Sequence, residues 1–149
     1  MSNNFTQAVF NNDVLISTLL GWVTAQTIKI SMGVLRQKKF DFRWLIRTGG
    51  MPSAHAAGVS ALATTVGIEY GVESGLFALA IAFAVVTMFD AQGVRRAAGR
   101  QAAILNRLIS EHDIKVKEKR LIELLGHTPI EVIAGSIVGI LIAILCVKI

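Results

Sequence analysis

Four long stretches of the chain contain very few charged residues, and polar segments separate them. They cover about residues 14–33, 53–70, 75–92 and 129–147. Each approaches the roughly 20 residues that an α-helix needs to cross the apolar core of a bilayer. The pattern therefore predicts an all-α fold: a polytopic membrane helix bundle of about four transmembrane helices, forming one membrane domain over residues 1–149.

The segment between the third and fourth stretches, residues 97–125, is charged but carries apolar residues at helical spacing. One apolar stripe consists of Ile104, Leu105, Leu108 and Ile109. A basic helix with one apolar face is typical of a helix that lies on a membrane surface. We therefore expect an amphipathic helical segment on the cytoplasmic surface between the last two spans. Residues 1–12 are polar, and we expect them to be poorly ordered or interfacial.

Composition and charge agree with a membrane protein and suggest its orientation. Hydrophobic residues make up 53% of the chain and charged residues 17%, whereas soluble domains carry about a quarter charged residues. Thirteen of the fifteen cations lie between the first and second stretches or between the third and fourth. By the positive-inside rule, both basic loops lie in the cytoplasm of a bacterial-type cell and both termini lie across its membrane. Because these loops flank spans, we expect them to contact membrane lipids and not nucleic acid.

Reactive polar residues gather at the span ends that face the basic loops. They are Lys29 at the end of the first span, Gly50, Ser53 and His55 at the start of the second, Asp90, Arg95 and Arg96 at the end of the third, and His127 and Glu131 at the start of the fourth. Ionisable residues within spans are costly and are functional candidates. Helix N-termini and arginine side chains both suit phosphate. The arrangement predicts a phosphate-ester site with two histidines.

His127 and Glu131 are four residues apart and therefore share one face of a helix. A carboxylate at this spacing can hold the imidazole in one tautomer, and histidine can attack phosphorus or transfer a proton near neutral pH. For Asp90 we expect a hydrogen bond that holds Arg95 or Arg96 toward the phosphate. The alternative is a divalent cation bound by Asp90, Glu131 and water; no other cofactor is expected.

Three segments resemble the motifs of the type 2 phosphatidic acid phosphatases, which share a fold with bacterial acid phosphatases and vanadium haloperoxidases. Lys29 and Arg36 have the spacing of a Lys-x6-Arg-Pro motif, although glutamine replaces the proline. The string Pro-Ser-Ala-His, which ends at His55, is similar to a Pro-Ser-Gly-His motif. His127 and Glu131 match a final His-x3-Asp, but the Ser-Arg pair of that motif is absent from its expected place. The fuller strings Gly-Gly-Met-Pro-Ser-Ala-His, Asp-Ala-Gln-Gly-Val-Arg-Arg and Gly-His-Thr-Pro-Ile-Glu-Val resemble a divergent, four-span branch of this superfamily.

The resemblance implies a lipid phosphate phosphatase that hydrolyses a phosphomonoester, such as phosphatidate, phosphatidylglycerophosphate or an isoprenoid phosphate. It implies that His127 is the nucleophile and forms a phosphohistidine, that Glu131 orients it, and that His55 protonates the leaving alcohol. It also implies that the phosphate is bound by Lys29, Arg36, Ser53 and the Gly50 region; we add Arg95 or Arg96 as the replacement for the missing arginine.

Two further expectations concern function and assembly. The same basic pocket can hold a lipid headgroup without hydrolysis, so a non-catalytic lipid-phosphate binder or transporter on the same fold is the alternative function. Four short spans enclose a pocket poorly, and a homodimer is therefore an expected partner arrangement.

Overall fold

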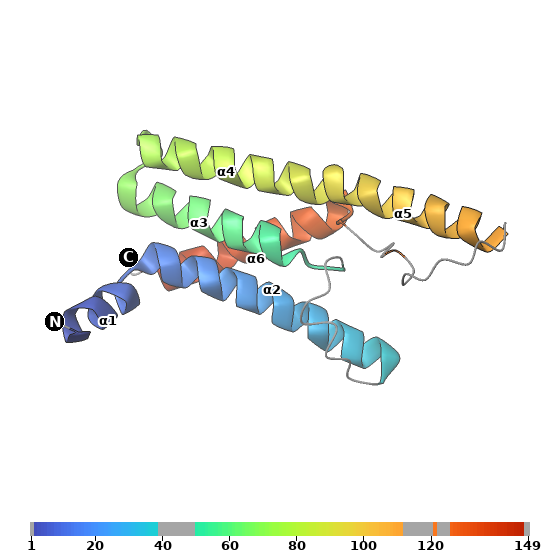
Figure 1. Cartoon of the computed structure of the whole chain (residues 1–149). Coiled ribbons are helices and arrows are strands. Elements are labelled where there is room, and N and C mark those ends of the chain that lie inside the picture. The colour runs from blue at the N-terminus through green and yellow to red at the C-terminus, as the bar shows by residue number, and fades with distance from the viewer. Residues whose placement is uncertain (1, 39–49, 112–120, 122–125, 148–149) are drawn as a thin grey trace.

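The computed structural model describes residues 2–38, 50–111, 121 and 126–147, and within these residues it contains helices and no strand (Figure 1). The helices are α1 (Ser2–Phe10), α2 (Asp13–Gln37), α3 (Ala54–Tyr70), α4 (Gly75–Gln92), α5 (Val94–Glu111) and α6 (Pro129–Cys146). Helices α2, α3, α4 and α6 alternate in direction, so the start of α1 and the end of α6 lie at the same end of the bundle. The predicted all-α fold is confirmed for these residues.

Polar caps explain where the four bundle helices begin. At each start a side-chain oxygen accepts a hydrogen bond from a backbone N–H three residues later, which satisfies one of the unpaired donors at a helix N-terminus. The capping residues are Asn12 for α2, Ser53 for α3, Ser74 for α4 and Thr128 for α6. The second predicted stretch, residues 53–70, corresponds to α3, which begins directly after its cap Ser53.

Three helical segments in the described part of the chain are long and apolar enough to cross a bilayer: Asp13–Gln37, Gly75–Glu111 and Pro129–Cys146. The predicted number of four spans is not confirmed, because α3 has only 17 residues. A helix of that length extends about 26 Å, slightly less than the roughly 30 Å apolar core of a bilayer. Helix α3 is instead the inner helix, which packs against α2, α4 and α6.

Small residues bring α3 close to its neighbours. A Cβ atom placed on Gly139 of α6 would collide with the Ala57 carbonyl oxygen of α3, and one placed on Gly135 would collide with the Ser53 carbonyl oxygen. On the other side of α3, a Cβ atom on Gly21 of α2 would lie 3.0 Å from the Ala61 Cβ. Such close approach is how helices associate in lipid, where van der Waals packing replaces the hydrophobic effect.

A buried hydroxyl pair joins α2 to α3. Ser17 and Thr65 are both fully buried, and their hydroxyl oxygens are 2.6 Å apart. We expect Thr65→Val, which keeps the shape but removes this bond, to lower the free energy of unfolding by about 0.6 to 1.7 kcal/mol. Thr18→Val is the matched control, because the Thr18 hydroxyl donates within α2, to the Val14 carbonyl. Unfolding in mixed detergent micelles measures both changes; equal losses would contradict an interhelical role for Thr65.

The first half of the predicted amphipathic segment forms helix α5, and its position at the membrane surface stays a prediction. It follows α4 in nearly the same direction (Figure 1), and hydrogen bonds from the Gly93 N–H to the Phe89 carbonyl and from the Ala97 N–H to the Gly93 carbonyl carry the helical pattern across the junction. A long apolar helix thus continues into a charged one. The second half of the predicted amphipathic segment, apart from Leu121, lies outside the described residues. So do the cations at positions 39–47 and 115–120.

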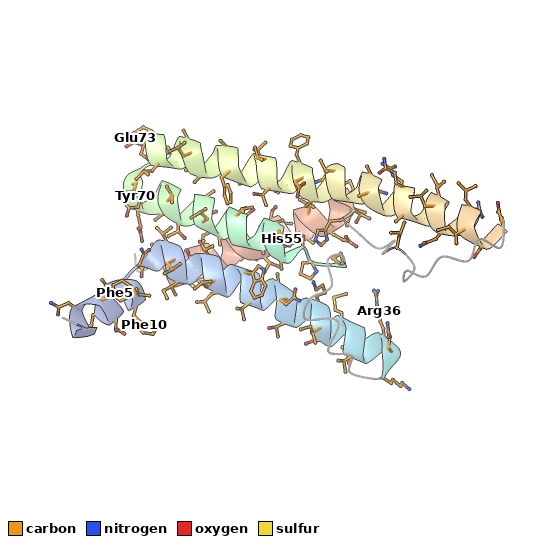
Figure 2. The ribbon with its side chains drawn as sticks, in the orientation of Figure 1. Phe5, Phe10, Arg36, His55, Tyr70 and Glu73 are labelled. Atoms are coloured by element: carbon orange, nitrogen blue, oxygen red, sulfur yellow. The ribbon has the colours of Figure 1, made fainter. Side chains whose placement is uncertain are left out.

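The first residues form a helix. We expected residues 1–12 to be poorly ordered or interfacial; Ser2–Phe10 forms the short helix α1, so they are ordered, and the interfacial position stays a prediction. Its aromatic side chains Phe5 and Phe10 are exposed, and Figure 2 shows both at the end of the molecule far from His55. Helix α1 therefore takes no part in the site described below.

Candidate active site

The candidate site lies where the N-termini of α3 and α6 meet. The Ser53 N–H donates a hydrogen bond to the Glu131 carbonyl oxygen over 2.9 Å, which ties the start of α3 to the first turn of α6. Two helix N-termini side by side place two positive dipole ends at one point, an arrangement that favours an anion. Figure 2 shows His55 at this end of α3.

A capping box at the start of α6 holds the Glu131 carboxylate. The Glu131 N–H donates to the Thr128 hydroxyl oxygen over 3.4 Å, and the Thr128 N–H donates to Glu131 Oε2 over 3.0 Å. The same Oε2 atom lies 3.1 Å from His127 Nδ1. Because a carboxylate only accepts, Nδ1 carries the proton and the lone pair of the imidazole is on Nε2.

The backbone of His127 is held from the other side by the end of α4. The His127 N–H donates to the Ala91 carbonyl oxygen over 2.9 Å. Gly126 precedes it with φ +84°, and a Cβ atom there would lie 2.5 Å from the Arg96 backbone nitrogen. Only glycine fits this conformation and this space. His127, 4% exposed, is therefore fixed both through its backbone and through its ring.

The second histidine faces the first. The ring centroids of His55 and His127 are 6.4 Å apart, and the ring planes are inclined by 60°. His55 is exposed, whereas His127 is buried. The two rings therefore lie close together, with the His55 ring on the exposed side of the pair.

Lys29 supplies a cation beside the two histidines. Its side chain carbons lie against Gly50, where a Cβ atom would be 3.4 Å from Lys29 Cδ, and its charge interacts with that of Glu131. Arg36 follows seven residues later, on the same face of α2 but about 10 Å further along the axis. Figure 2 shows Arg36 near the end of α2, away from His55, and its side chain is exposed. The structure thus brings Lys29 to Gly50 and within range of the Glu131 charge but leaves Arg36 apart.

Ser53 has a structural place in the site. Its side chain is fully buried, and its hydroxyl oxygen accepts a hydrogen bond from the Ala56 N–H over 3.3 Å. This is the geometry of a helix cap. The predicted contact between Ser53 and phosphate stays a prediction, and the observed bonds assign Ser53 to holding the start of α3.

Asp90 at the end of α4 is more buried than the Arg96 side chain at the start of α5. Asp90 is half-buried and directly precedes Ala91, the residue whose carbonyl holds His127. The Arg96 side chain is exposed, and only its backbone contacts the site, at Gly126. Arg95 belongs to the first turn of α5, and its side chain lies outside what the structure describes. Within the described residues, no three His, Cys, Asp or Glu side chains gather into a possible metal site.

Sequence reasoning missed the backbone contacts that fix His127. The Ala91 carbonyl and the Arg96 backbone carry no side-chain signal, so no motif marks them. A glycine directly before His127 was the one available signal, because glycine tolerates the positive φ and the tight contact with Arg96 that the structure shows at Gly126.

These features define a helical membrane protein with a two-histidine site at one end of its bundle. The chain belongs to the divergent PAP2 family, whose model matches residues 10–142. It is 43% identical over 149 residues to "Uncharacterized membrane protein YuiD" of Bacillus subtilis (strain 168), covering 91% of this chain and 94% of that relative. No solved structure matches the chain. Together with the three candidate spans, the relative identifies an integral membrane protein.

Proposed function

We propose that this protein is a membrane-embedded lipid phosphate phosphatase that works through a phosphohistidine. The observation that carries the proposal is the arrangement of His127, with Nδ1 3.1 Å from the Glu131 carboxylate and its ring 6.4 Å from that of His55. A nucleophilic imidazole oriented by a carboxylate, with a proton-transfer group beside it, is a constellation suited to nucleophilic catalysis.

The reaction follows from this geometry. His127 Nε2 attacks phosphorus, its bond to phosphorus forms, and the bond between phosphorus and the lipid oxygen breaks. His55 gives its proton to the departing oxygen, so that the lipid leaves as an alcohol. Water then attacks the phosphohistidine, His55 takes a proton from this water, and inorganic phosphate leaves. Glu131 stabilises the positive charge that His127 acquires in the first step.

The phosphate oxygens meet positive groups from three elements. Lys29 approaches from α2, and the paired N-termini of α3 and α6 supply their dipoles. We include the Gly50 region in this set because it lies against Lys29. Arg36, Ser53 and one of Arg95 and Arg96 remain proposed contacts. That of Arg36 requires movement of the end of α2 when substrate binds, because its side chain lies away from His55.

The substrate we propose is a lipid phosphomonoester with its headgroup at the bundle end and its tail among the apolar helices. We place this end and the basic loops in the cytoplasm, following the charge distribution of the loops. Phosphatidate, phosphatidylglycerophosphate and isoprenoid phosphates all meet this description.

The test is phosphate release by purified protein in mixed micelles, with a panel of these lipid phosphates and with or without chelator. We expect release from at least one lipid and no dependence on divalent cations. A wild-type protein that binds lipid phosphate but releases none from any member of the panel would contradict the proposal and favour the binder or transporter. Loss of activity with chelator would instead indicate a required divalent cation, for which Asp90 and Glu131 are the candidate ligands.

Glu131→Gln separates the charge of Glu131 from its role as a cap. Glutamine also serves at this position of a capping box, so the fold should persist. The neutral amide cannot stabilise a positive imidazole, and we expect kcat to fall by about 10²- to 10⁴-fold. Phosphate release at saturating substrate measures this, with Glu69→Gln at the opposite end of α3 as the control. Equal rates for wild type and Glu131→Gln would exclude Glu131 from catalysis.

A further inference from the structure

Three arginines of α5 form a stripe along one side of the helix. Arg96, Arg100 and Arg107 are four and eleven residues apart, so at about 100° per residue they fall within an arc of about 40°. All three side chains are exposed. Arg107 lies 3.7 Å from Glu111, the one acidic residue of α5, so the stripe keeps a net positive charge.

This arginine stripe continues the outer face of α4. The helical hydrogen bonds run through Gly93, so positions on α4 and α5 can be compared on one helix. Phe89 is seven residues before Arg96 and therefore lies within the same arc. Its ring is 70% exposed, whereas Ala84 and Ala91, on the side of α4 toward the bundle, are buried. The arginines thus face the lipid side and not the site.

Apolar side chains border the stripe. Ile104 is 60% exposed and lies about 40° from the nearest arginine, with the exposed Leu108 beyond it. Another side of α5 is covered: Ala102 and Asn106 are buried, and the Asn106 side chain exchanges two hydrogen bonds with the backbone of Leu121. The exposed surface of α5 therefore includes a cationic stripe with apolar side chains beside it.

We propose that this surface of α5 docks on an anionic lipid bilayer, with the arginines on headgroup phosphates and Ile104 and Leu108 among the upper acyl chains. Charge complementarity selects this occupant, because arginine binds phosphate oxygens in a planar fork. Position selects it as well, because the stripe directly follows the lipid-facing side of α4. The proposal is independent of the phosphatase activity proposed above.

Docking requires the continuous α4–α5 helix to tilt, so that its charged end approaches the membrane surface. The 37 residues of Gly75–Glu111 extend about 55 Å, which exceeds the 40–45 Å thickness of a bilayer with its headgroups. Arg107 lies about 16 Å beyond Arg96 along the axis. An upright helix would carry Arg107 into water, whereas a leaning helix brings the whole stripe onto the headgroups.

The experiment measures how deeply α5 lies in a bilayer. In a Cys146→Ala background, a fluorophore is attached to Ile104→Cys or to Ser110→Cys, about 120° away on the helix. The full chain is reconstituted into vesicles of phosphatidylcholine alone or with phosphatidylglycerol, and lipids brominated in the acyl chain serve as quenchers. We expect quenching at position 104 only in the anionic vesicles, little quenching at position 110, and loss of the difference in high salt.

Substitutions that change the charge of α5 test whether its contact with the bilayer is electrostatic. Replacing Arg96, Arg100 and Arg107 together with glutamine should lower the docking equilibrium constant about a hundredfold, since each cation near an anionic surface contributes about fivefold. Glu111→Gln, which removes the one acidic side chain of α5, should raise it. Circular dichroism of each variant checks the helix.

Three results would overturn the proposal. One is equal quenching at position 104 in neutral and anionic vesicles. Another is unchanged quenching in the triple variant. The third is quenching that follows the protein-to-lipid ratio and ignores lipid charge, which would identify a second copy of the chain as the occupant.

Discussion

Replacing His127 with alanine should abolish phosphate release, with a loss of at least about 10⁴-fold in kcat, because it removes the nitrogen that forms the covalent intermediate. His127 is buried, its ring is held by the Glu131 carboxylate, and its backbone is held by the end of α4. A water molecule that fills the space left by the ring cannot form the phosphohistidine. Substrate binding should change little, since the cationic contribution of Lys29 remains. Phosphate release and lipid binding, measured on the same preparation, give both quantities.

The control must separate loss of chemistry from loss of fold. His127→Gln keeps a polar side chain of similar size, and His112→Ala removes the third histidine, which the sequence places in a charged segment and which lies outside the described residues. We expect the glutamine variant to be as inactive as the alanine variant and His112→Ala to be fully active. Residual activity of either His127 variant within tenfold of wild type would exclude a nucleophilic role.

Replacing His55 with alanine should lower the rate on lipid phosphates by about 10²- to 10⁴-fold, the usual contribution of a general acid. The loss should depend on the leaving group. With an aryl phosphate such as p-nitrophenyl phosphate, the leaving group p-nitrophenolate departs without protonation. Transfer of the phosphoryl group to His127 should therefore be nearly unaffected by the substitution. The second step still needs a base, and the phosphohistidine should therefore accumulate on this variant.

The dependence on the leaving group distinguishes proton transfer from structure. The His55 ring is exposed and lies at the first turn of α3, so its removal leaves the packing of α3 intact. A burst of p-nitrophenolate equal to the enzyme concentration, followed by slow turnover, is the expected time course. Equal losses on alkyl and aryl phosphates, with no burst, would mean that His55 acts on binding or fold only.

The apolar pattern of the sequence predicted the helices well, and it could not predict how they pack. Helix α3 has the apolar character of a span and 17 residues, and it contacts three neighbouring helices, with small residues at the close approaches to α2 and α6. The pattern placed residues 97–111 on a helix correctly. It could not predict that this helix continues α4, since the geometry at Gly93 follows from hydrogen bonds to residues on either side.

For the site, predictions from local spacing were better than predictions from charge alone. The four-residue spacing of His127 and Glu131 indicated a contact, and the two side chains are in contact. Arg95 or Arg96 was predicted to bind phosphate because each is a cation at this end of a span, and that contact stays a prediction; the exposed Arg96 side chain lies on the outer face of α5. A cation carries no periodic signal that distinguishes the inside of a bundle from its lipid side, so sequence alone cannot make this assignment.

The central claim is that His127 becomes phosphorylated during turnover, and trapping that adduct tests it most directly. Wild type and the His55→Ala variant are mixed with p-nitrophenyl phosphate or a lipid phosphate, quenched in alkali, digested and mapped by mass spectrometry. The account predicts one phosphoryl group on the peptide that contains His127, at higher occupancy in the His55→Ala variant and absent from His127→Gln. Phosphate release by the wild type without any adduct at His127 would contradict it.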